Sequence, residues 1–113
     1  MSNPIQQWIN RPVVVLFAAA QDDPDYLTMI DRIYHHRQPL EQRGVLVITV
    51  SGMRVTIDGQ STTAFTPSEL RRMLEVQSHG FALIVLGDDG SERTRRFEPM
   101  TIEELLSSLD NRD

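Results

Sequence analysis

Three short apolar runs are the clearest pattern in the chain. Val13–Phe17, Val45–Val50 and Phe81–Leu86 are rich in Val, Ile and Leu and are bounded by Pro, Gly or polar residues. Runs of this length and composition predict strands that are buried on both faces. After the third run, Gly87–Gly90 predicts a tight turn, so Glu92–Phe97 is expected to form a fourth strand antiparallel to the third.

Three amphipathic helices are expected around these strands. Each begins at a recognisable signal, which is Asp23 followed by a proline in the first helix and a capping box in the other two. Apolar residues then recur every three or four positions, so each helix can pack one face against a sheet. The expected helices are Pro24 to about Arg37, Pro67 to about Gln77 and Ile102 to about Leu109, with the boxes at Thr66 with Glu69 and Thr101 with Glu104.

Residues 51–65 fit either a short hairpin that turns at Asp58 and Gly59 or a long irregular connection, and we favour the hairpin. The predicted fold class is therefore α/β, with the order β-α-β, an insertion, and then α-β-β-α. We expect a single domain over residues 1–113, built as a three-layer sandwich around a mixed four-stranded core sheet. The first two strands should be parallel, because a helix connects them.

Composition places the chain among globular proteins and removes several classes of function. Its 113 residues are the size of one domain, and 40% hydrophobic with 24% charged residues is typical of a folded chain. A net charge of -5 argues against non-specific binding to nucleic acid, and no apolar run approaches the roughly 20 residues that span a bilayer. The absence of cysteine excludes a disulfide, a thiolate nucleophile and a Cys-ligated metal.

The N-terminal region has two interpretations. The segment RPVVVLFAAAQ (11–21) resembles a secretory signal with its cleavage site. However, it contains Pro12 and follows ten residues of mixed character, and its apolar part fits a buried strand equally well. We therefore expect a soluble, cytoplasmic protein that keeps residues 1–20. Export, with cleavage after Ala20, is the alternative.

The predicted order of strands and helices is similar to that of thioredoxins. GFALIVLGDDG (80–90) resembles their third strand and turn, and AAAQDDPDY (18–26) lies where their Cys-x-x-Cys motif opens the first helix. Both cysteines are missing here. The cis-proline that packs over that motif would fall near Ala82, and it is missing too. The resemblance therefore implies a thioredoxin-like scaffold without disulfide exchange.

Three segments carry a second resemblance: RPVVVLFA, DDPDY and FALIVLGDDGSERTRRFEPMTIEELLSSLD. Over nearly the whole chain they are similar to the thioredoxin-like P-DUDES family of domains of unknown function. That family is found in small bacterial proteins and, as repeats, in some vertebrate secreted sushi-repeat and matrix proteins. The family usually has Lys at the second position of the turn, where this chain has Asp88. No role of that lysine can therefore be carried over to this chain. The resemblance implies the fold and a non-redox role, and it supplies no catalytic residue.

Acidic and basic clusters supply the candidate binding residues. Asp22, Asp23 and Asp25 stand at the start of the first helix, where capping and the helix dipole explain them without a ligand. These carboxylates would repel an anion, so any ligand at this edge is expected to be cationic or a basic protein surface. Arg93 and Arg95 alternate on the fourth strand, so one face could hold a carboxylate or phosphate, or protect a sheet edge from pairing with another chain.

The histidines do not form a metal-binding pattern. His35 and His36 are adjacent near a helix end, and His79 is far along the chain, so we expect the first two to contact carbonyls of the last turn. Nucleotide-binding and hydrolase motifs are absent from the sequence. We therefore expect no metal and no cofactor, and we assign no catalytic residue.

Two functional hypotheses follow. The first is a non-redox binding or interaction module on a thioredoxin-like scaffold, with a protein partner and with Asp22, Asp25, Arg93 and Arg95 as binding residues. The alternative is a Cys-independent hydrolase or transferase that uses the acidic loop 19–25 with an Arg of the fourth strand. An enzyme requires a pocket that joins these two groups, whereas a module requires only a surface. The sequence does not indicate the oligomeric state.

Overall fold

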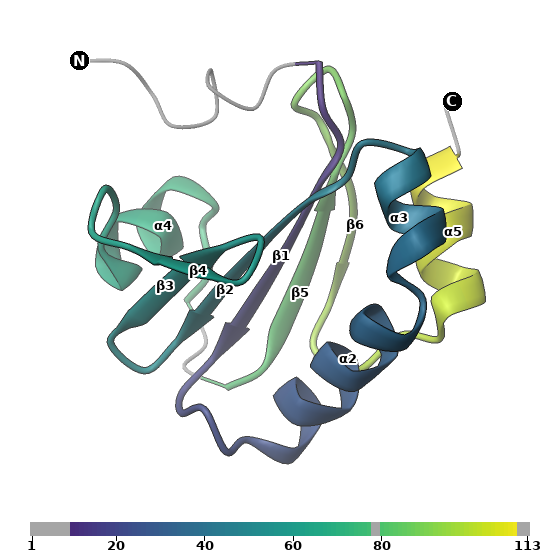
Figure 1. Cartoon of the computed structure of the whole chain (residues 1–113). Helices are drawn as coiled ribbons and strands as arrows, with labels where there is room; N and C mark the ends of the chain where they lie inside the picture. Colours follow the sequence, from purple (N-terminus) through teal and green to yellow (C-terminus); the bar gives the residue numbers. More distant parts are fainter. Residues whose placement is uncertain (1–9, 78–79, 111–113) are drawn as a thin grey trace.

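The computed structural model describes residues 10–77 and 80–110, in which helices are interspersed among the strands along the chain (Figure 1). The four strands and three helices expected from the sequence are all present. The structure adds one short helix and resolves the insertion into two strands. In order, the elements are β1 (Val13–Ala18), α2 (Pro24–His35), α3 (Arg37–Gln42), β2 (Leu46–Ser51), β3 (Arg54–Ile57), β4 (Gln60–Thr62), α4 (Pro67–Met73), β5 (Ala82–Leu86), β6 (Glu92–Arg96) and α5 (Ile102–Asp110).

The six strands form one open, mixed sheet in the order β4-β3-β2-β1-β5-β6. β1 is parallel to β2, as expected, and every other pair of neighbours is antiparallel. The prediction of a four-stranded core sheet needs correction, because the hairpin of β3 and β4 adds two strands to it. This hairpin extends the sheet at the edge of β2, where Ile48 pairs with Ile57 and Ser51 pairs with Arg54.

The hairpin itself is the arrangement favoured from the sequence. Ile57 pairs with Gln60, so Asp58 and Gly59 form a two-residue turn. Both turn residues have a positive φ, of 50° and 83° respectively. Asp-Gly suits this turn because aspartate tolerates the left-handed region and glycine adopts it without strain.

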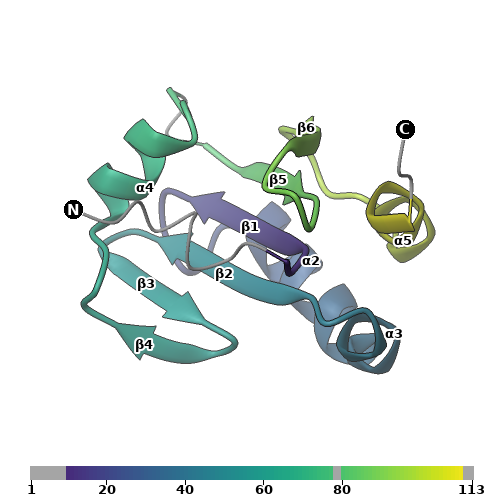
Figure 2. The same cartoon turned by 90° about the horizontal axis from the view of Figure 1, so that it is seen from above.

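β1 lies in the interior of the sheet, and its side chains alternate between two cores. Val13, Val15 and Phe17 pack with residues of α4, whereas Val14, Leu16 and Ala18 pack with residues of α2, α3 and α5. All six side chains are at most 1% exposed, which confirms the prediction of a strand buried on both faces. Figure 2 shows the same division, with α4 on one side of the sheet and the other helices on the opposite side.

The first helix ends earlier than expected, at His35, and α3 follows it at once. Pro39 explains the break, because proline has no N–H to donate to the carbonyl of residue 35 and its ring collides with that carbonyl. His36 accordingly leaves helical geometry, with φ -123° and ψ 32°. Pro39 then falls in the first turn of α3, where a missing N–H is tolerated. Leu40 of this extra helix is buried in the core.

α4 is also shorter than expected and ends at Met73 instead of about Gln77. Glu75 adopts a φ of 55°, a left-handed conformation that terminates a right-handed helix. The start of α4 agrees with the sequence. The Thr66 hydroxyl accepts the Glu69 N–H at 3.1 Å, and the Glu69 carboxylate accepts the Thr66 N–H at 2.9 Å, which completes the predicted capping box.

Across the described ranges, 10–77 and 80–110, none of the helices has both the length and the apolar character needed to cross a membrane.

Candidate functional site

The acidic loop before α2 is organised by Asp23. Its carboxylate accepts the backbone N–H groups of Asp25 at 2.9 Å and of Tyr26 at 3.1 Å, so the predicted helix cap is confirmed. Asp22 and Asp25 are exposed. Within the described part of the chain they take part in no ion pair, so both carboxylates remain available at the surface.

A β-bulge divides the predicted pair Arg93 and Arg95. In the ladder with β5, Thr94 pairs with Val85 and Glu92 pairs with Leu86, so Arg93 is the extra residue between them. A bulge interrupts the alternation of side chains along a strand. The expectation that both arginines share one face is therefore wrong.

The two arginines consequently have different surroundings. Arg95 reaches the end of α4, where its guanidinium donates to the carbonyls of Leu74 and Glu75, which the helix leaves without partners. Arg93 lies beside the backbone of Gly87 and lines a hollow of about 430 Å³. Its Nη1 atom is buried and has no hydrogen-bond partner among the described residues. Because its guanidinium is bound to the end of α4 and to Glu92, Arg95 has a structural role.

The acidic loop and Arg93 lie at opposite ends of the sheet. The loop follows Ala18, the last residue of β1, whereas Glu92 is level with Leu86 and hence with Val13, the first residue of β1. The structure does not bring Asp22 or Asp25 together with Arg93. Arg93 is therefore separated from the acidic loop by the length of β1, whereas Arg96 pairs with Leu83, is level with Leu16, and lies nearer to the loop.

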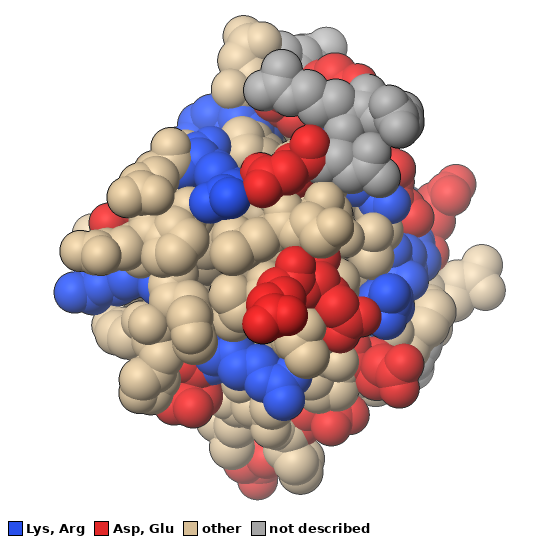
Figure 3. Space-filling model, turned by 90° about the vertical axis from the view of Figure 1, so that its right-hand side faces the viewer, with Lys and Arg blue, Asp and Glu red and all other residues tan. Residues whose placement is uncertain are grey.

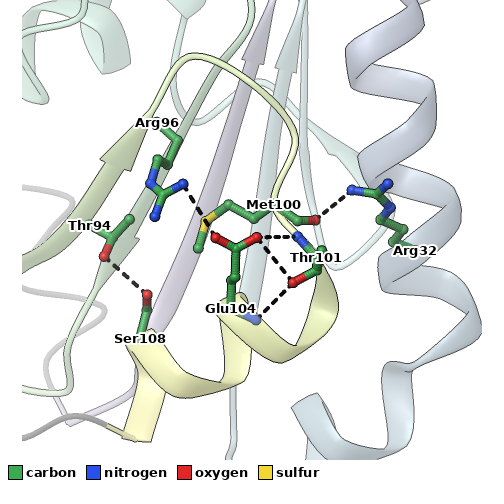
Figure 4. Close-up of polar contacts among 7 residues, drawn as sticks. All are labelled: Arg32, Thr94, Arg96, Met100, Thr101, Glu104 and Ser108. Atoms are coloured by element: carbon green, nitrogen blue, oxygen red, sulfur yellow. Dashed lines mark hydrogen bonds and ion pairs between the residues drawn. The ribbon is translucent and has the colours of Figure 1, made fainter.

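A network of polar contacts fixes the start of α5 against β6 and α2 (Figure 4). Thr101 and Glu104 form the second predicted capping box. Hydrogen bonds from the Thr101 backbone N–H and hydroxyl hold the pKa of Glu104 below its ordinary value, and Arg96, whose Nη1 lies 3.4 Å from the carboxylate, adds to the effect. Arg32 donates to the carbonyl of Met100 at 2.8 Å. These side chains join three elements, so they are structural.

His35 and His36 behave as expected from the sequence. Their Nδ1 atoms lie 2.8 Å from the carbonyl oxygen of Asp31 and 3.0 Å from that of Arg32, in the last turn of α2. Both side chains are exposed. His79 lies outside the described residues. Among those that are described, no three His, Asp or Glu side chains form a group that could hold a metal ion.

A groove of about 630 Å³ lies between α2 with α3 and the neighbouring half of the sheet, and we name it the β2–β3 groove. Its floor consists of three cross-strand rows: Val47 beside Asp58, Thr49 opposite Thr56, and Ser51 opposite Arg54. The alternate residues of both strands point to the core beneath α4. The floor is therefore a polar strip on an otherwise apolar sheet.

The hydroxyl groups of Thr49 and Thr56 form a hydrogen bond with each other on this floor. The two residues are only 5% and 8% exposed. Since the pair has two hydroxyl protons and this bond uses one, a second O–H remains to donate. Ser51 is 2% exposed, and its hydroxyl has no side-chain hydrogen bond among the described residues. The floor thus offers two hydroxyl donors to a ligand.

The opposite wall of the groove is largely apolar. It is formed by Tyr26, Ile30, Ile33 and Tyr34 of α2 and by Leu40 of α3. Tyr34 is 69% exposed, and the guanidinium of Arg37 lies over its ring, 5.9 Å from the centroid. An apolar wall that faces a few polar groups, in a volume between about 300 and 1,000 Å³, is typical of small-molecule sites.

Arginines line the groove and lack carboxylate partners. Arg11, Arg37 and Arg54 form no ion pair with any described residue. Outside the groove, by contrast, Arg43 and Arg95 are each paired with an acidic side chain. On the face of α2, α3 and α5, acidic and basic side chains are interspersed (Figure 3). Glu41 and Asp58 also line the groove, so its three arginines exceed its carboxylates by one positive charge among the described residues.

The β2–β3 groove is not predicted from the sequence, because the run Val45–Val50 looks uniformly buried. The signal was nevertheless present in the alternation. Thr49 and Ser51 are two residues apart on β2, and Arg54 and Thr56 are two residues apart on β3, so each pair lies on one face of its strand. Polar residues on the same face of two neighbouring strands indicate a face that no helix covers completely.

Comparison with known proteins gives the family of the chain. A search of the curated proteins found no match. The model of the family described as "Domain of unknown function (DUF4174)" matches residues 6–112, which is nearly the whole chain. The chain therefore belongs to the DUF4174 family.

Proposed function

We propose that this protein is a non-redox binding module on a thioredoxin-like scaffold, with the β2–β3 groove as its ligand site. The observation that carries the proposal is the groove itself. It combines an apolar helix wall, a floor of hydroxyl groups and three arginines without ion-pair partners. Such a combination can bind and orient a ligand, and its described lining residues include no nucleophile hydrogen-bonded to a basic side chain.

The order of elements supports the thioredoxin-like part of the proposal. When α3 and the hairpin of β3 and β4 are set aside, the chain runs β1, α2, β2, α4, β5, β6, α5. This is the order of thioredoxin-like domains, including those of the P-DUDES family that the sequence resembles. The chain lacks cysteine, so such a scaffold would serve binding instead of thiol exchange.

A protein partner at the acidic loop remains part of the proposal. Asp22 and Asp25 are exposed at the end of β1. Nearby, Met53 is 90% exposed and lines a shallow hollow with Ala19 and Ala20. Exposed carboxylates beside an apolar side chain favour a partner with a basic and partly apolar surface.

The groove can be tested as a binding site by NMR. We expect titration with neutral indole to shift the backbone amide signals of Thr49, Thr56 and Tyr34. Val47→Phe should abolish these shifts, because Val47 lines the groove. Gln60→Phe is the matched control, since Gln60 is exposed and pairs with Ile57, whose side chain packs in the core beneath α4. Shifts that persist in Val47→Phe, or that never reach the groove residues, would show that the site is elsewhere.

A further inference from the structure

We infer that the β2–β3 groove binds a small organic monocarboxylate, with its apolar or aromatic body along α2 and its carboxylate at Arg54. The inference rests on the proposed function, because it takes the groove as the ligand site. It goes further by naming the class of ligand and the direction in which the ligand lies.

The charges along the groove give the direction. At the end near Gly44 and Gly59, the positive charges of Arg11 and Arg37 are balanced by the carboxylates of Glu41 and Asp58, all of which line the groove. Arg54 lies at the other end of the groove. It pairs with Ser51 of β2, which in turn pairs with Ala18 at the end of β1. No carboxylate lines this second end in the described residues. A negative group is therefore stabilised more at Arg54 than anywhere else in the groove.

The carboxylates of the neighbouring acidic loop do not line this end of the groove. Gln21, the residue before Asp22, lines both the groove and the shallow hollow beside it. Asp22 and Asp25 line neither. The end of the groove at Arg54 thus contains one cation, an amide and a hydroxyl.

The contacts of Arg54 indicate a carboxylate. Its Nε donates to the Ser61 hydroxyl at 2.9 Å, which holds the guanidinium in place. The two Nη groups are left without a partner in the described structure. Their parallel N–H bonds match the two oxygens of a carboxylate. A phosphate monoester carries close to two negative charges at neutral pH, which a single arginine would not balance.

The floor and the wall complete the recognition. Ser51 lies directly opposite Arg54 and supplies a hydroxyl donor to the same carboxylate. Thr49 is two residues away on the same face, about 7 Å along the strand, so the threonine pair lies beneath the next atoms of the ligand. Tyr26, Ile30 and Ile33 then cover the apolar body.

Three indole compounds whose side chains are anionic, neutral and cationic test the inference. Indole-3-acetate is the anion, indole-3-acetamide is the neutral analogue and tryptamine is the cation. In calorimetric and NMR titrations, we expect indole-3-acetate to bind about tenfold more tightly than the amide, because a charged hydrogen bond is stronger than a neutral one. Tryptamine should bind most weakly.

Variants of the chain locate the anion. Arg54→Gln should weaken indole-3-acetate about tenfold and leave the amide unchanged. Arg72→Gln is the matched control, because Arg72 is an exposed arginine that does not line the groove. Ser51→Ala should weaken the anion about threefold, and it provides a second test if Arg54→Gln does not fold.

The outcomes separate this inference from the proposed function. If the anion and the amide bind equally at the groove, or if Arg54→Gln and Ser51→Ala leave the anion unaffected, the inference is wrong while the groove remains the site. Tighter binding of tryptamine also overturns the inference. If none of the three compounds shifts groove residues, the proposed function fails as well.

Discussion

Thr49 and Thr56 lie directly opposite each other on β2 and β3, and each hydroxyl has the other as its partner. Both residues are buried, so removal of one hydroxyl leaves the other without its protein partner on the floor of the groove. We expect Thr49→Val or Thr56→Val alone to lower the free energy of unfolding by about 1–3 kcal/mol. The double variant should be close to the wild type, because it leaves neither hydroxyl behind. Urea denaturation of all four proteins completes the cycle, and additive losses would contradict the argument.

A second prediction concerns the cap of α2. Asp23→Ala removes the acceptor for two backbone N–H groups and should cost about 1 kcal/mol in the free energy of unfolding. Asp22→Asn and Asp25→Asn remove exposed carboxylates that do not cap the helix, so they should change stability much less. If the loop binds a basic partner, these two variants should weaken that binding. Denaturation midpoints and binding measured on the same three variants separate the two roles.

A third prediction concerns pH. Hydrogen bonds from the Thr66 backbone and hydroxyl hold the pKa of Glu69 below its ordinary value of 4.5. The ionised Glu69 carboxylate therefore stabilises the folded state fully above about pH 4.5. This contribution to the free energy of unfolding is lost as pH falls through the lowered pKa of Glu69 in the folded state. Glutamine can still form the capping box, so Glu69→Gln should lose less stability than the wild type between about pH 5 and pH 3.

Urea midpoints at several pH values measure this difference. Glu103→Gln removes one exposed negative charge from outside both capping boxes and serves as the control for net charge. The same acid dependence in Glu69→Gln and in the wild type would contradict the assignment to Glu69.

A fourth prediction is the absence of thiol chemistry. Disulfide reduction proceeds by attack of a thiolate, and the chain has no cysteine. The purified protein should therefore reduce insulin no faster than buffer with dithiothreitol alone, while a cysteine-containing thioredoxin in the same assay is active. Reduction above the buffer rate would require a chemistry that the sequence does not contain.

Much of the fold follows from local sequence signals. Val13–Phe17 is apolar at every position, as expected of an interior strand, and β1 is indeed buried on both faces. The capping boxes at Thr66 and Thr101 mark the starts of two helices, because the side chain that caps is within three residues of the N–H that it satisfies. Signals that act over a few residues can be read directly from a single chain.

Errors arose where a distant contact decides the outcome. Arg93 falls on a bulge that depends on the pairing of β6 with β5, so alternation along β6 alone gives the wrong face. α3 follows α2 directly, and its Leu40 is buried in the core beside residues that are distant in the sequence. The β2–β3 groove requires two strands and two helices to come together. In each case the missing information is which element lies alongside, which local patterns do not contain.

The position of β1 also has a consequence for synthesis on the ribosome. β2 follows β1 after two helices, whereas β5, its other neighbour, is made only after β3, β4 and α4. Until then, one side of β1 would present unpaired backbone groups along a row of apolar side chains. That is the geometry through which nascent chains associate with one another. The synthesis of Ala82–Leu86 therefore ends the interval in which this edge of β1 has no partner strand within the chain.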